Sequence, residues 1–129
     1  MLKANFITAQ EAAEKIQDGS TVCTIGMTLV SASESILKAI EKRFETVGHP
    51  ADITLVHSCG QSDRKDGIQH LAHEGLVKRI VGSHWGLQPR WMEMIANSQV
   101  EAYCLPQGQI AQLYRSMACG LPGKMSKVG

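Results

Sequence analysis

The chain has 129 residues, of which 43% are hydrophobic, and this suffices for one domain with a continuous buried core. Its net charge is +1, and its basic residues fall in isolated pairs rather than along one stripe, which argues against a nucleic-acid partner. No apolar run reaches the roughly 18 residues of a membrane-spanning helix, and the first residues lack the pattern of a secretory signal. We therefore expect a cytoplasmic protein without a membrane partner.

The four cysteines, Cys23, Cys59, Cys104 and Cys119, are never two residues apart, so their spacing matches neither a zinc ribbon nor a disulfide framework. The first three lie in apolar, strand-like runs, where a free thiol commonly packs as a small buried hydrophobe. We expect these three thiols to be buried and reduced.

Taken in chain order, the hydrophobic pattern predicts one helix followed by four strand–helix units. Capping boxes, which pair a Ser or Thr with a Glu three residues later, are present at residues 8–11 and 31–34. The first box opens a helix to Ile16, and the second opens a helix that ends at Gly48 and Pro50. The remaining predicted elements are strands at 20–26, 53–59, 79–82 and 100–105, and helices at 68–77, from Pro89 onward, and at 109–118.

Alternating strands and helices with short connections predict an α/β fold, with a mostly parallel sheet and helices on both of its faces. Ligands of such folds bind at the carboxyl ends of the strands. This rule selects residues 26–33, 60–67, 82–89 and 106–109 as candidate site segments. The amides of the helix start after Gly26 suit a phosphate or an oxyanion, although every strand–turn–helix unit presents such amides.

Short catalytic motifs are absent, including phosphate-binding glycine loops, the nucleophile elbow and His-Glu-x-x-His. His70 and His73 lie three residues apart, so both rings share one face of a helix, as metal ligands do. Since no third ligand lies nearby in the sequence, we expect two hydrogen-bonded structural histidines and no metal.

One long block is far more specific than any short motif. Residues 69–90 read QHLAHEGLVKRIVGSHWGLQPR and residues 101–108 read EAYCLPQG. Both resemble the family I CoA-transferases, in particular the propionate or acetate CoA-transferase branch, and the similarity extends to residues 7–12, 18–22 and 42–50. The resemblance implies a CoA-transferase fold of which residues 1–129 are the N-terminal portion, so that the fold is truncated and its second half is missing.

The resemblance also implies a ping-pong reaction that moves coenzyme A between short carboxylic acids. A glutamate in the second half of such enzymes attacks the acyl-CoA, forms an acyl anhydride and then becomes a glutamyl-CoA thioester. Gln107 matches a glutamine whose amide lies at the oxyanion site. Gly26, Gly60 and Gly108 match substrate-binding positions, and Met27 joins them where the family usually has a second glycine.

The nucleophilic glutamate of this family stands in a Glu-x-Gly-x-x-Gly-Gly context that this sequence lacks. We therefore expect the isolated chain to be inactive, and to form a homo-oligomer or to bind a subunit that supplies the glutamate. The substrates implied are an acyl-CoA and a short carboxylate, with no tightly bound cofactor. The alternatives are a non-catalytic binding or assembly module, and, by fold analogy alone, a sugar-phosphate isomerase-like domain.

Overall fold

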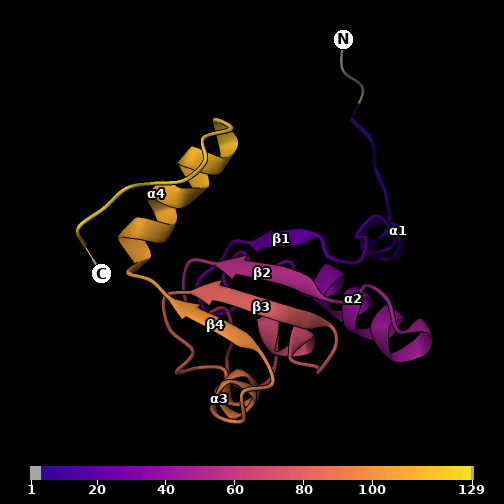
Figure 1. Cartoon of the computed structure of the whole chain (residues 1–129). Helices are drawn as coiled ribbons and strands as arrows, with labels where there is room; N and C mark the ends of the chain where they lie inside the picture. The colour runs from indigo at the N-terminus through magenta and orange to yellow at the C-terminus, as the bar shows by residue number, and fades with distance from the viewer. Residues whose placement is uncertain (1–3, 129) are drawn as a thin grey trace.

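The structure is a computed structural model that describes residues 4–128 (Figure 1). Helices and strands alternate along the chain as the hydrophobic pattern predicts. The elements, in order, are α1 (Ala9–Glu14), β1 (Thr21–Thr24), α2 (Glu34–Val47), β2 (Ile53–His57), the 3-10 helix η1 (Gly67–Leu71), β3 (Val77–Gly82), α3 (Pro89–Ala96), β4 (Glu101–Cys104) and α4 (Gln107–Ala118). In this part of the chain no helix has the length and apolar character needed to cross a membrane.

The four strands form one parallel sheet in the order β1-β2-β3-β4, which confirms the predicted α/β class. Because every strand runs in the same direction, all four carboxyl ends lie at one end of the sheet. The register aligns Val22, Leu55, Ile80 and Ala102 across the strands, so that this row of apolar side chains points to one face.

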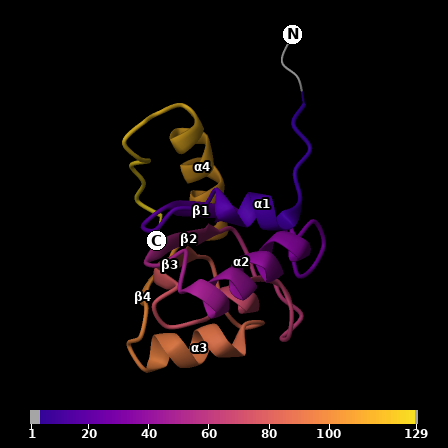
Figure 2. The ribbon, with the colours of Figure 1, turned by 90° about the vertical axis from the view of Figure 1, so that its right-hand side faces the viewer.

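That apolar face carries the core. Helices α2 and α3 lie on this side of the strands, and α4 lies on the other (Figure 2). Helices therefore occupy both faces, but unequally, since α4 is the one helix on the second face within residues 4–128. Leu55, Ile80 and Trp91 are fully buried between sheet and helices. The other members of this core cluster are Ala13, Leu37, Ile40, Ile53, Ile68, Leu71, Leu76, Val77, Met94 and Val100.

Local sequence signals explain several helix ends. The first capping box is confirmed, because the Thr8 amide donates to Glu11 Oε2 at 2.6 Å and the Glu11 amide donates to Thr8 Oγ1 at 3.2 Å. Helix α2 ends at Gly48, which has the left-handed φ of 75° that glycine tolerates best. Helix α3 begins at Pro89, as predicted.

Two local predictions are wrong. The second capping box does not form: α2 begins at Glu34, its N-cap Ser33 makes no side-chain cap bond, and the Glu34 carboxylate binds the Gly67 amide instead. The helix predicted at residues 68–77 is a short 3-10 helix that ends at Leu71. A turn at Gly75, with φ of 87°, separates it from β3.

The prediction for the cysteines is also wrong for two thiols. Cys59 is buried, but Cys23 and Cys104 are exposed. Cys23 belongs to the row of Val56, Val81 and Tyr103, whose side chains point to the face opposite the core. A strand that is apolar in sequence thus leaves one of its two faces uncovered in this structure.

Candidate functional site

The loop after β1 is a tight turn that requires a glycine. Gly26 has a φ of 152°, and a side chain on it would lie 2.9 Å from the Val30 carbonyl oxygen. Met27 and Val30 form an antiparallel bridge across the turn. The Met27 side chain is 63% exposed, so it lies free at the end of the sheet where the site was predicted.

Three hydrogen bonds join this turn to the one after β2. Cys59 Sγ donates to the Gly26 carbonyl at 3.0 Å, and the Thr28 amide donates to the Gly60 carbonyl at 2.8 Å. Gln61 Nε2 donates to the Thr24 carbonyl at 2.8 Å. Residues more than thirty positions apart are thereby fixed side by side, so the turns at Gly26 and Gly60 lie together at one end of the sheet, as the parallel topology predicts.

The turn after β3 supports Gly60 from the other side. The Gly60 amide donates to His84 Nε2 at 3.2 Å, and a side chain on Gly60 would lie 2.6 Å from His84 Cε1. Ser83 Oγ donates to the Ser58 carbonyl at 2.6 Å. The glycine at position 60 is therefore needed for the close approach of the imidazole, which holds this turn in place.

Gln107 and Gly108 begin α4, directly beyond β4, and both residues are exposed at the carboxyl end of the sheet. They are not next to Gly26, because β2 and β3 lie between β1 and β4; three strand spacings amount to roughly 14 Å. Helix α4 crosses back toward β1 (Figure 1), and Tyr114 Oη lies 3.5 Å from the Thr24 carbonyl. Helix α4 thus links the end of β4 to the end of β1.

Sequence reasoning missed a buried polar group beneath these turns. His57 is fully buried at the end of β2, and its Nδ1 donates to the Cys59 carbonyl at 2.8 Å. Burial lowers the pKa of His57 to about 4, because the charged imidazolium loses its hydration. A side chain on Gly82 would lie 2.2 Å from His57 Nε2, so the glycine that ends β3 makes room for the ring. The sequence did contain a signal for this buried ring, namely a histidine near the end of one predicted strand and a glycine at the end of the next.

His70 and His73, the pair that lies three residues apart, are hydrogen-bonded, as predicted. His70 Nδ1 lies 2.5 Å from Glu41 Oε2, and His73 Nε2 lies 2.9 Å from Glu41 Oε1. Both rings therefore reach one carboxylate of α2.

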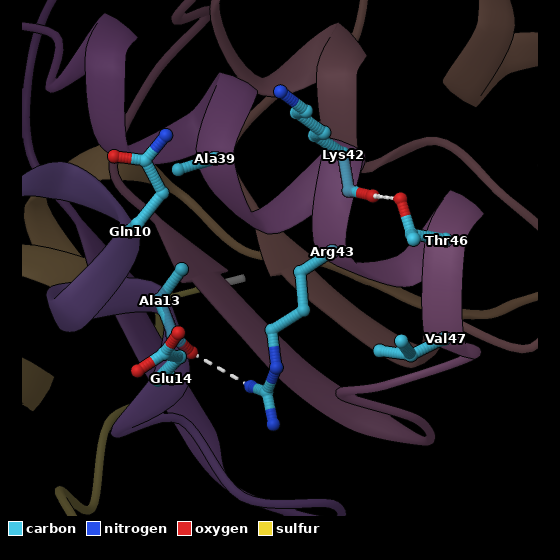
Figure 3. A pocket seen from close by; sticks show the side chains of 8 residues that line it. All are labelled: Gln10, Ala13, Glu14, Ala39, Lys42, Arg43, Thr46 and Val47. Carbon is cyan, nitrogen blue, oxygen red and sulfur yellow. Dashed lines mark hydrogen bonds between the residues drawn. The ribbon is translucent and has the colours of Figure 1, made fainter.

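A separate groove of about 310 Å³ lies between α1 and α2, away from the strand ends (Figure 3). Arg43 extends along it and donates from one guanidinium nitrogen to the Ala13 carbonyl at 2.7 Å and to the Ile16 carbonyl at 2.8 Å. Helix α1 has no basic residue in its last turn, so Arg43 neutralises its carboxyl end from the neighbouring helix. We interpret this groove as part of a helix–helix contact.

A parallel sheet with helices packed on it defines this chain as an α/β protein, a class whose ligands bind at the carboxyl ends of the strands. Residues 6–129 match the Coenzyme A transferase family, and the chain belongs to that family. It is 38% identical over 127 residues to the caffeate CoA-transferase of Acetobacterium woodii, covering 98% of this chain and 24% of that protein.

Two further relatives agree. The acyl-CoA transferase YdiF of Escherichia coli O157:H7, solved as a thioester complex with CoA, superposes with a TM-score of 0.87 and is 32% identical; the match covers 95% of this chain and 26% of that chain. The alpha subunit of a probable coenzyme A transferase of Bacillus subtilis is 28% identical, over 95% of this chain and 51% of that protein. The chain therefore spans about a quarter of the length of the first two relatives and about half of the third.

Proposed function

We propose that this chain forms one side of the active site of an acyl-CoA transferase that moves coenzyme A between short-chain carboxylic acids. The observation that carries the proposal is the set of interlocked turns at the carboxyl ends of the strands, in a chain whose residues 6–129 match the family. Gly26, Met27 and Gly60 contact substrate at these turns, Gly108 contacts it at the start of α4, and Gln107 provides an oxyanion donor.

The reaction begins with a glutamate carboxylate that attacks the carbonyl carbon of the acyl-CoA. The carbonyl oxygen gains negative charge, and collapse of this intermediate expels the CoA thiolate and leaves an acyl anhydride. The thiolate then attacks the glutamyl carbonyl, which releases the first carboxylate and forms the glutamyl-CoA thioester; the acceptor acid reverses these steps. The exposed Gln107 amide is suited to donate to the oxyanion that each attack creates.

The glutamate nucleophile comes from outside residues 1–129. Glu34 is the glutamate that begins α2, beside the turn of Gly26, but both of its oxygens are engaged. Its Oε1 lies 2.8 Å from His70 Nε2 and 3.0 Å from Lys38 Nζ, and its Oε2 accepts from the Gly67 amide at 2.9 Å. Three donors occupy this carboxylate, so it is not free to attack a substrate.

The missing side of the site implies a covering partner. Ile25, Met27 and Val30 are 70%, 63% and 67% exposed at the strand ends, and the second face of the sheet also bears exposed residues. An apolar patch of this kind is typical of an interface. We propose that it is covered by a partner subunit of CoA-transferase sequence that supplies the glutamate. A second copy of residues 1–129 would cover the patch without supplying one.

The first experiment uses the isolated chain. Incubation with acetyl-CoA and propionate is expected to give no propionyl-CoA above the uncatalysed rate, because no anhydride forms without the glutamate. Formation of propionyl-CoA would show that the chain contains its own nucleophile. The isolated chain is compared with the chimera described next. If the isolated chain binds CoA without transferring it and the chimera is also inactive, the alternative of a binding or assembly module is favoured.

The second experiment tests Gln107 in a chimera in which this chain replaces the matching quarter of the A. woodii caffeate CoA-transferase. Gln107→Ala is expected to lower kcat roughly a hundred- to a thousand-fold, with a smaller change in KM, because one oxyanion donor is lost. The matched control is Gln112→Ala, an exposed glutamine on the same helix, and it is expected to leave kcat unchanged. Equal kcat values for the two variants would show that Gln107 is not an oxyanion donor.

A further inference from the structure

His70 is held between carboxylates on both of its ring nitrogens. Its Nδ1 lies 2.5 Å from Glu41 Oε2, while its Nε2 lies 2.8 Å from Glu34 Oε1 and 3.2 Å from Asp66 Oδ1. The His70 side chain is 13% exposed and Glu41 is 18% exposed, so these contacts are shielded from water. Two of the carboxylates come from α2, and Asp66 comes from the loop that leads into η1.

This geometry fits the imidazolium and no neutral tautomer. A neutral imidazole carries one N–H, so its other nitrogen would present a lone pair to a carboxylate oxygen at 2.5 or 2.8 Å. Both contacts are favourable only when both nitrogens are protonated. The positive charge of His70 then offsets the mutual repulsion of Glu34, Glu41 and Asp66.

Other charged groups complete the cluster. Lys38 of α2 pairs with Glu34 at 3.0 Å and with Asp66 at 3.3 Å, but it is 53% exposed, so its pairs are weakened by solvent. Arg90 of α3 lies 3.5 Å from Glu41, and His73 bonds the same carboxylate at 2.9 Å. His70 is thus the one cation among these that contacts all three carboxylates.

The cluster also reaches the candidate site. Glu34 accepts from the Gly67 amide at 2.9 Å, which fastens the end of the 62–67 loop to the first turn of α2. The Ile68 amide donates to the Gln61 carbonyl, and Gln61 in turn bonds the Thr24 carbonyl below the turn of Gly26. The position of the 62–67 loop is therefore linked through hydrogen bonds to the turns at the strand ends.

We propose that protonated His70 is an electrostatic clasp that holds the 62–67 loop against α2, and that the loop is released when His70 loses its proton. Neutralisation leaves three carboxylates facing one another, and Asp66 can relieve the repulsion by moving away with its loop. The residues that follow stay in place, because Ile68 and Leu71 are fully buried and Trp91 Nε1 donates to the Ile68 carbonyl at 2.8 Å. The result is a local opening beside the candidate site, rather than unfolding.

The titration of His70 sets the direction of the effect. Burial of the ring lowers its pKa, but the hydrogen bonds to Glu41 and Glu34, with the charges of those carboxylates, outweigh burial and raise the pKa above its usual value. A histidine with a raised folded-state pKa stabilises the structure fully below its unfolded pKa of about 6.5. That contribution is lost as pH rises from there through the folded-state value.

The test needs only the unmodified chain. Two-dimensional proton–nitrogen spectra of the histidine rings are expected to show both nitrogens of His70 protonated at pH 6.5. In hydrogen exchange, protection of the Gly67 amide is expected to fall up to about tenfold for each pH unit within the titration range, relative to the β2 amide of Leu55. A neutral His70 ring at pH 6.5, or Gly67 protection that follows Leu55 at every pH, would overturn the proposal.

Variants separate the clasp from general charge effects. Glu41→Gln is expected to move the His70 titration and the loss of Gly67 protection together to lower pH. Lys38→Met removes an exposed cation and is expected to reduce Gly67 protection equally across the pH range. His49→Gln, which removes the exposed histidine paired with Asp18 at 2.9 Å, is the matched control and is expected to change neither profile. A Glu41→Gln variant with an unchanged His70 titration would contradict the proposal.

Discussion

Among the described glycines, Gly67 is the one at which an added Cβ would make the closest contact. Its φ is 77°, in the left-handed region, and a Cβ added to it would lie 2.0 Å from the Gln61 carbonyl oxygen. That oxygen also accepts the hydrogen bond of the Ile68 amide, so it cannot retreat without breaking the closure of the 62–67 loop. Gly67→Ala should therefore be costly for two separable reasons, backbone strain and steric overlap.

A substitution at Gly48 measures the backbone strain alone. Its φ of 75° is nearly the same, but no atom lies within 4 Å of the position that a Cβ would occupy. Gly48→Ala should lower the free energy of unfolding by about 1–2 kcal/mol, the usual cost of placing an L-residue in the left-handed region. Gly67→Ala carries the same strain and adds about 1–3 kcal/mol for overpacking.

Urea unfolding followed by circular dichroism measures both changes. The free energy of unfolding of the two variants and of the unmodified chain comes from the midpoint and the slope of each transition. We expect Gly67→Ala to be less stable than Gly48→Ala by about 1–3 kcal/mol, a large share of the stability of a small domain. Equal losses in the two variants would refute the reasoning, because the overlap with Gln61 would then contribute nothing.

Two further predictions concern charge. Arg43→Met should lower the free energy of unfolding by about 1–3 kcal/mol, because two carbonyls of α1 lose a charged donor, while Lys42→Met on the same helix should change it by less than about 0.5 kcal/mol. Equal urea midpoints for the two variants would contradict this role of Arg43. His57 has its pKa lowered to about 4, so its contribution to stability is complete above pH 6.5 and is lost as pH falls toward 4. Ring nitrogen spectra should show His57 neutral and protonated on Nδ1 at pH 5.5, and an imidazolium at that pH would contradict the prediction.

The candidate site could be predicted in part because it depends on topology. Parallel strands place their carboxyl ends together, so the turn at Gly26, the turn at Gly60 and the start of α4 at Gln107 were expected at one end of the sheet. The hydrogen bonds that join the first two turns could not be predicted, since the donors on Cys59 and Gln61 reach acceptors more than thirty residues away. The separation of Gln107 from Gly26 by two strands likewise follows from strand order, which the hydrophobic pattern does not encode.

The sequence by itself determined the features that depend on neighbours along the chain. The alternation of strands and helices, the capping box at Thr8 and the helix end at Gly48 all follow from interactions within a few residues. The long block of residues 69–90 also indicated the family, which the match of residues 6–129 confirms.

Tertiary structure decided which partner a side chain binds wherever several partners compete for it. Glu34 suits a capping box in sequence, but its carboxylate binds His70, Lys38 and the Gly67 amide, because folding brings charged and backbone donors that the single Ser31 amide cannot match. Cys23 lies in an apolar strand, yet it is exposed, because a strand has two faces and only packing decides which of them is covered.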